Sequence, residues 1–248
     1  MLRGPQGTLY GRNTIGGAIR YVTKRLSDER EFSAKASFGT YNQADVVLSG
    51  NLPAGDNFRI GGTLAKFKHD GWGDYLTTDE ENADKDITAM RVSMEWDLGE
   101  SVFVRLAGDY SIDESTSRQG HRLLVGPAGE PVLSDVWDTR AGISQLPAST
   151  GGLDPETTQG GFGLTIQWDI NDNLQFKSIT SQRADTSTSW IDFDNLPTDY
   201  FDAPVIYDNE QFSQEFQLTY TGDRLAGVVG LYQLDANAFN AFDVVIFS

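Results

Sequence analysis

Apolar and polar residues alternate along several stretches of the chain, each about ten residues long. Three stretches show the pattern without a break: 87–98, 102–112 and 160–170. In the second, Val104 and Leu106 fall on one side of an extended chain and Arg105 falls on the other. Such alternation predicts β-strands with two unlike faces. These strands are longer than the five or six residues usual in globular proteins.

The connections between the alternating segments are of two kinds. Tight turns rich in Gly, Asp and Asn are expected at 39–42, 53–57, 98–100, 170–173 and 221–224. Long polar connections are expected at 69–86, 113–157 and 186–208. The two kinds alternate after the first hairpin, whose own tip at 39–42 is short, so the later short turns share one end of the sheet. Nine strands are predicted, at 31–39, 42–52, 58–68, 86–97, 101–112, 158–169, 174–185, 209–220 and 225–236.

Long strands with short turns at one end and long loops at the other are typical of a transmembrane β-barrel, since the bilayer sets the strand length. Three aromatic residues favour this fold: Trp96, Trp168 and Tyr220 each stand just before a short turn, on the apolar face. Aromatic rings at that position lie at the depth of the lipid headgroups. A soluble β-sandwich is the alternative, with shorter strands and less polarised loop lengths. The predicted fold class is all-β, an antiparallel barrel.

The charge of the chain changes near Leu26. Residues 1–25 carry five Arg and Lys residues and no acidic residue, whereas the rest carries the other 14 of the 19 basic residues and all 36 acidic residues. We therefore place a segment boundary near Leu26. The acidic body argues against nucleic acid as a partner, because neutralising phosphates requires clustered Lys and Arg.

Side chains with catalytic or metal-binding spacing do not stand out. There is no cysteine, which excludes disulfides and thiolate metal sites. The two histidines, His69 and His121, are isolated in expected loops, so we predict no metal site and no cofactor. No Ser-His-Asp or Cys-His grouping is apparent, and we predict that the protein is not an enzyme. Trp72, in the expected loop "HDGWGDY", is a candidate ligand contact.

The basic segment is also rich in glycine. In "LRGPQGTLYGRNTIGGAI", residues 2–19, the glycine spacing does not match a nucleotide-binding loop. This stretch resembles the end of the plug domain of TonB-dependent outer-membrane receptors. The resemblance rests on Leu-Arg-Gly-Pro at 2–5, Tyr-Gly at 10–11 and Gly-Gly-Ala-Ile at 16–19, followed by a closing strand. The stretch "QEFQLTY", residues 214–220, is similar to a barrel strand of that family.

The resemblance implies a plug that blocks a barrel of about twenty-two strands, until an inner-membrane TonB complex pulls on it. It also implies that Arg3 locks the plug to carboxylates of the barrel wall, as a buried guanidinium must. Glycines would provide turns and close backbone approach. The residues assigned to the plug motif and lock are Arg3, Gly4, Pro5, Gly7, Tyr10, Gly11, Gly16 and Gly17.

The expected domains are the C-terminal end of a plug, 1–25, and the N-terminal part of a receptor barrel, 26–248. The fold is thus a partial barrel of about nine strands in the outer membrane of a Gram-negative bacterium. The resemblance implies energised uptake of a scarce ligand such as an iron-siderophore complex, with membrane lipid and the TonB complex as partners. We expect the chain to be a fragment that does not transport alone. A passive channel or adhesin barrel, or a barrel hydrolase, remains an alternative.

Overall fold

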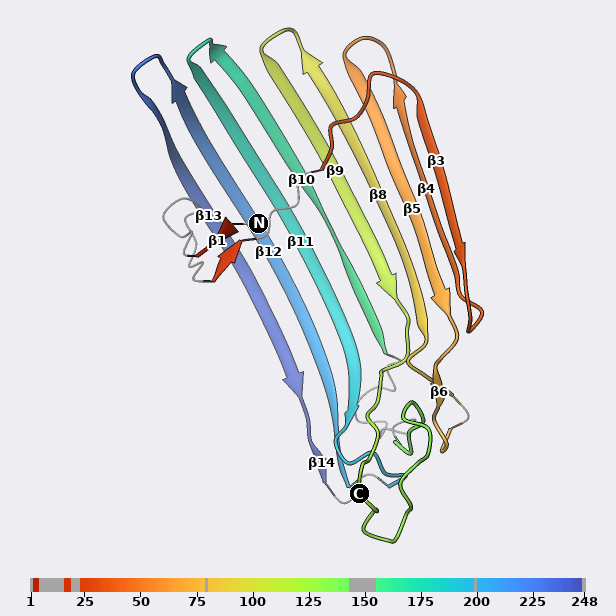
Figure 1. Cartoon of the computed structure of the whole chain (residues 1–248). Coiled ribbons are helices and arrows are strands. Elements are labelled where there is room, and N and C mark those ends of the chain that lie inside the picture. Colours follow the sequence, from red (N-terminus) through yellow and green to blue (C-terminus); the bar gives the residue numbers. More distant parts are fainter. Residues whose placement is uncertain are drawn as a thin grey trace.

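The computed structural model describes residues 2–4, 16–18, 23–78, 80–142, 155–198 and 200–246. Nine long antiparallel strands form one curved sheet in it (Figure 1). They are β3 (Glu31–Phe38), β4 (Ala44–Pro53), β5 (Phe58–His69), β8 (Lys85–Leu98), β9 (Val102–Asp113), β10 (Glu156–Asn171), β11 (Leu174–Asp192), β12 (Phe201–Thr221) and β13 (Ala226–Phe242). The prediction of nine antiparallel strands is confirmed.

Short strands complete the described fold. β1 (Leu2–Arg3) pairs with β2 (Gly17–Ala18), and β6 (Gly73–Asp74) pairs with β7 (Glu81–Asn82). β14 (Val245–Ile246) pairs with the start of β12. Among the described residues there is no helix long and apolar enough to cross a membrane.

Each long strand pairs with its neighbours in chain order, from β3 at one edge of the sheet to β13 at the other. The tight turns after β4, β8, β10 and β12 lie at one end of the sheet (Figure 1). The β3–β4 turn lies at the other end with the long connections, where the Asp70 amide donates a hydrogen bond to the Tyr41 carbonyl at 2.8 Å. Gly99, in the turn between β8 and β9, has a φ of 69°, a backbone conformation that glycine adopts without strain. Within the described residues the sheet is open, as a partial barrel requires.

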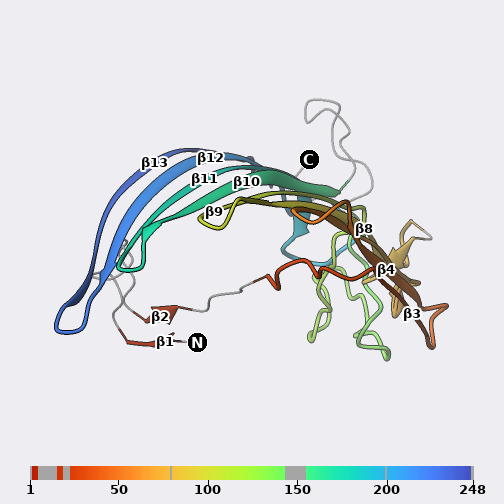
Figure 2. The ribbon, with the colours of Figure 1, turned by 90° about the horizontal axis from the view of Figure 1, so that it is seen from above.

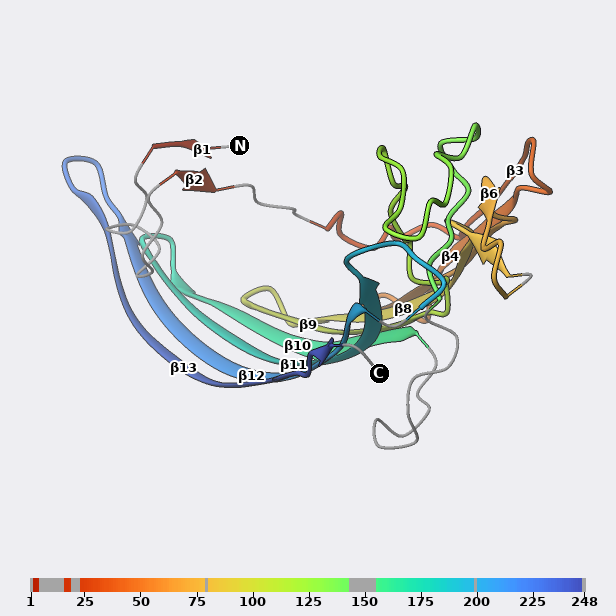
Figure 3. The same ribbon diagram turned by 90° about the horizontal axis from the view of Figure 1, so that it is seen from below.

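The register places residues of one parity on each face. Leu106 lies opposite Met94 and Leu164, while Arg105 lies opposite Glu95 and Thr165. Residues 23–30 run along the concave side of the sheet (Figures 2 and 3). Their backbone contacts the Arg105 side chain, so Arg105 marks the concave face. The apolar set therefore faces outward on the convex side, which matches the predicted alternation.

The predicted loop at 186–208 is wrong for most of its length. β11 continues to Asp192 and β12 already begins at Phe201. In the extension of β11, residues 186–189 are all Thr or Ser, so the alternation of hydropathy disappears there although the strand does not. Hydroxyl groups bond across the strands instead: Thr158 Oγ1 lies 2.6 Å from Thr186 Oγ1, and Thr157 Oγ1 lies 2.8 Å from Ser187 Oγ.

We predict that a spin label on the convex face meets an apolar environment and that its neighbour in sequence meets water. In vesicle-reconstituted protein, a label at Leu164→Cys should collide more with oxygen, and one at Thr165→Cys more with a water-soluble nickel chelate. Electron paramagnetic resonance measures both collision rates. Equal accessibility at the two positions, or the reverse order, would contradict the assignment of the faces.

Candidate functional site on the concave face

The segment 23–30 is held against the sheet by backbone and side-chain contacts. Asn51 Nδ2 of β4 donates hydrogen bonds to the carbonyl oxygens of Ser27 and Glu29, both at 2.7 Å. A Cβ added at Gly61 of β5 would lie 2.5 Å from Leu26 Cδ2, so the Leu26 side chain packs directly over the backbone of Gly61. The segment therefore packs on the strands rather than only crossing them.

Glu95 of β8 lies at the centre of an ion-pair network. Its side chain is fully buried. Arg105 Nε of β9 donates a hydrogen bond to Glu95 Oε1 at 2.7 Å, and the other carboxylate oxygen accepts one from the Leu26 amide at 3.2 Å. Arg25 Nε and Arg59 Nε lie 3.7 and 3.9 Å from that same oxygen, Oε2. The carboxylate thus joins the N-terminal segment to the wall of the sheet.

A second carboxylate extends the network toward the short-turn end. Asp97 accepts a hydrogen bond from Arg25 Nη2 at 3.2 Å and also pairs with Arg59. Arg59, itself buried, reaches a third carboxylate on Asp28 of the segment. The Arg25 guanidinium also lies 3.8 Å from the centre of the Phe103 ring, a cation–π contact.

The charges of this network balance. Three guanidinium groups, of Arg25, Arg59 and Arg105, face three carboxylates, of Glu95, Asp97 and Asp28. A carboxylate as buried as Glu95 is stable only when cations and hydrogen-bond donors replace its lost water. We call these six residues the Glu95 network.

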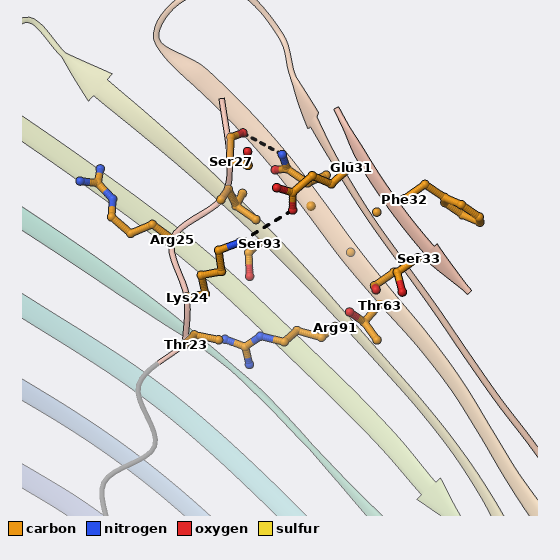
Figure 4. A pocket seen from close by; sticks show the side chains of 16 residues that line it. Thr23, Lys24, Arg25, Ser27, Glu31, Phe32, Ser33, Thr63, Arg91 and Ser93 are labelled. Atoms are coloured by element: carbon orange, nitrogen blue, oxygen red, sulfur yellow. Dashed lines mark hydrogen bonds and ion pairs between the residues drawn. The ribbon is translucent and has the colours of Figure 1, made fainter. Parts of the chain in front are cut away.

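Beside the network lies a polar cavity of about 560 Å³ between the segment and β3, β4, β5 and β8. In Figure 4, Lys24 reaches across it toward Glu31, with Nζ 3.9 Å from Oε2. Thr63, Arg91 and Ser93 line the side formed by the sheet (Figure 4). The cavity wall offers hydroxyl groups and both signs of charge.

The structure describes only part of the predicted plug motif. The pair β1–β2 lies on the concave side of the sheet (Figure 2). Gly4 and Gly17 have φ values of 84° and 138°, so both use the conformational freedom expected of them. Gly16 is exposed. Pro5, Gly7, Tyr10 and Gly11 lie outside the described residues, as does the side chain of Arg3, so the predicted lock of Arg3 stays a prediction.

Trp72, the predicted ligand contact, belongs to an aromatic cluster at the long-loop end. Its ring stacks on His69 with centres 5.5 Å apart, and it meets the edge of Trp137 at 4.9 Å. The Arg118 guanidinium lies 5.0 Å from the centre of the Trp137 ring. The connection that carries Arg118 and Trp137, residues 114–142, folds over the concave side (Figures 2 and 3).

The loops at this end share buried contacts. Asn82 Nδ2 donates to the Trp137 carbonyl at 2.8 Å, and Asn82 Oδ1 accepts from the Gln119 amide at 3.1 Å. Gln119 Nε2 in turn donates to the Trp190 carbonyl at 2.7 Å. Tyr75 is buried and donates its hydroxyl to the Ser117 carbonyl. The predicted loops are therefore packed together, which gives the aromatic cluster a rigid support.

Asp192, at the loop end of β11, receives three backbone N–H groups, from Gly142, Asp194 and Asn195. Burial raises its pKa to about 6, although these hydrogen bonds oppose the shift. The carboxylates of Asp192, Asp194 and Asp202 come within 4.8 Å of one another. The sequence did not predict this group, because the three residues are brought together by the pairing of β11 with β12.

No protein-family model matches the sequence, but solved structures share its fold. The ferric yersiniabactin uptake receptor FyuA from Yersinia pestis matches with a TM-score of 0.78 and 17% identity, over 98% of this chain and 36% of that one. The ferric-catecholate import receptor Fiu from K12 E. coli matches at 0.70 and 15%, over 97% and 36%. The pyoverdine receptor FpvA from Pseudomonas aeruginosa PAO1 matches at 0.69 and 13%, over 98% and 35%.

The chain has the fold of a TonB-dependent siderophore receptor. It spans about a third of the length of the receptors that it matches. In a TonB-dependent receptor fold the concave face corresponds to the interior of the barrel. The Glu95 network and the polar cavity therefore occupy the interior side, and the aromatic cluster lies at the long-loop end of that side.

We predict that Glu95→Gln loosens the segment 23–30. Removing the buried charge takes one carboxylate away from Arg59 and Arg105. Breaking a buried ion pair in this way lowers the free energy of unfolding by about 3 kcal/mol. Trypsin should then cleave after Lys24 and Arg25 at least tenfold faster than in the unmodified protein. Asp109→Asn is the control, since Asp109 pairs with Arg91 and Arg183 elsewhere on the concave face. Equal cleavage rates in the two variants would refute an anchoring role for Glu95.

We also predict that the buried loop end around Asp192 opens more easily as the pH rises, because opening returns the ionised carboxylate to water. The folded pKa of about 6 exceeds the ordinary 3.8, so the folded state holds the proton more tightly. The free energy by which protonated Asp192 stabilises the closed state is complete below about pH 4 and is lost as the pH passes 6, a change on the order of 3 kcal/mol. Hydrogen exchange of the Gly142 and Asn195 amides, corrected for the intrinsic rate, measures it.

Asp192→Asn should remove this pH dependence, because the amide oxygen still accepts hydrogen bonds but does not titrate. Asp113→Asn, at the loop end of β9, should leave it unchanged. A dependence that persists in Asp192→Asn would assign the titration to another group.

Proposed function

We propose that the chain forms part of an outer-membrane TonB-dependent receptor that takes up an iron-siderophore complex. The observation that carries the proposal is the match of nearly the whole chain to barrels of siderophore receptors, combined with a charged segment bound inside the curve of the sheet. Residues 1–25 are then the end of the plug and 26–248 the first part of the barrel. Energy would come from the TonB complex.

The placement of segment 23–30 favours a plugged receptor over a passive channel or an adhesin. An open pore needs no anchor on its inner wall, whereas Arg25 and Asp28 join the Glu95 network from the N-terminal side. The two histidines do not favour a hydrolase. His69 Nδ1 lies 2.8 Å from the Asp70 carbonyl, and His121 Nδ1 lies 3.2 Å from that of Asp138.

The aromatic cluster is the proposed first contact for the ligand. Trp72, Trp137 and Arg118 present two indole rings and a guanidinium at the long-loop end of the concave side. Trp72 keeps 39% of its surface exposed, so a ligand can reach it. An anionic ferric catecholate would stack its rings on the indoles and pair its charge with Arg118.

Binding of ferric tris(2,3-dihydroxybenzoate) to the refolded chain tests this proposal. We expect the complex to quench tryptophan fluorescence saturably, and the iron-free ligand to do so far more weakly. Arg118→Gln and Trp72→Ala should each weaken binding about tenfold, or 1.4 kcal/mol. Trp168→Phe, on the convex face, is the control and should bind as the unmodified chain does. Equal affinity for iron-free and iron-loaded ligand would overturn the proposed ligand class.

A further inference from the structure

The convex face carries an apolar groove that the proposed transport function does not use. It has a volume of about 700 Å³ and crosses β3, β4, β5 and β8. Gly50 and Gly62 form its floor, and its walls include Phe32, Leu52, Leu64 and Met90. All these side chains have the parity of the convex face.

The groove exists because two glycines lie opposite each other. Gly50 of β4 pairs with Gly62 of β5, so two adjacent strands lack side chains at the same level. Around this gap the walls are large and exposed: Phe32 keeps 78% and Leu64 keeps 59% of its surface. A Cβ at Gly50 would meet Glu31 O at 3.6 Å and Phe32 Cδ2 at 3.8 Å, which are ordinary van der Waals contacts, so a side chain fits there without strain.

A cation stands at one end of the groove. Arg30 lines it, and Arg30 immediately precedes Glu31, which pairs with Asn51 near the short-turn end of β4. Two residues beyond the groove-lining Ile60 toward the turns, Phe58 stacks on Trp96 with ring centres 4.8 Å apart. Such aromatic pairs mark the depth of lipid headgroups. Arg30 is exposed and forms no ion pair with any residue that the structure describes.

We propose that this groove binds a phospholipid of the leaflet on the short-turn side. One acyl chain lies over Gly50 and Gly62, and the Arg30 guanidinium pairs with the lipid phosphate. The combination of an apolar channel with a single unpaired cation at headgroup depth is complementary to an anionic or zwitterionic phospholipid. The inference rests on the proposed membrane orientation of the convex face.

Filling the groove tests the proposal. The full chain is refolded into detergent micelles, and native mass spectrometry measures the binding of dioleoyl phosphatidylglycerol. We expect one saturable site. Gly50→Leu should reduce affinity at least tenfold, because its side chain occupies the acyl position without displacing backbone. Gly108→Leu is the matched control, since Gly108 faces the same convex side outside the groove and its Cβ would meet no atom closer than 3.5 Å.

The variant Arg30→Gln distinguishes the contribution of the lipid headgroup to binding from that of the acyl chain. This variant should bind phosphatidylglycerol about fivefold to tenfold more weakly, and free glycerol 3-phosphate should not compete with the lipid in the unmodified chain. Competition by glycerol 3-phosphate would mean that Arg30 binds a phosphate without an acyl chain in the groove, and would overturn the proposal. Equal lipid binding by Gly50→Leu and Gly108→Leu would also overturn it. Circular dichroism confirms that each variant retains its strands.

The failure of this inference is distinguishable from failure of the proposed function. If Gly50→Leu keeps full lipid affinity while the label at Leu164→Cys meets lipid, the groove assignment alone is wrong. If that label meets water, the membrane orientation itself is wrong, and the receptor proposal fails with it.

Discussion

Because successive side chains of a strand point to opposite faces, the register of the nine paired strands decides what every other part of the molecule meets. The parity that places Arg105 and Glu95 on the concave face also places Leu106 and Met94 on the convex face. A register slip of one residue in any strand would move its charged side chains to the convex face and its apolar side chains to the concave face. The anchor of the N-terminal segment, the loop cluster and the convex groove all depend on this pairing.

The Glu95 network shows how a charged concave face retains a specific partner. A solvated carboxylate would attract Arg25 only weakly, since exposed ion pairs contribute little. At Glu95 the water is gone, and the Leu26 amide and the Arg105 guanidinium have replaced it. Detaching the segment would leave this buried carboxylate with fewer partners, so detachment is unfavourable in free energy. The Glu95 network therefore determines where the N-terminal segment binds on the sheet as well as how strongly it binds.

The long-loop end is held together by neutral hydrogen bonds between side chains and the backbone of distant loops. There the described side chains that are most buried include Thr139, Ala141 and Leu196, and the polar ones are joined to backbone groups of distant loops. Asn82 and Gln119 satisfy each other and thereby fix the loop that carries Trp137. An aromatic surface built on such a framework presents a fixed shape to a ligand, which lowers the ordering cost of binding.

The sequence by itself determined the strands, their faces and the polarity of their connections, because two-residue periodicity and turn chemistry are local signals. It also marked the basic N-terminal segment by charge. It did not predict that β11 continues through Thr186 to Asp192, since hydroxyl-rich stretches such as 186–189 lack a hydropathy pattern. Nor did it single out Glu95 among 36 acidic residues. Only the tertiary structure decided that, because Leu26 and Glu95 are 69 residues apart and burial depends on what meets in space.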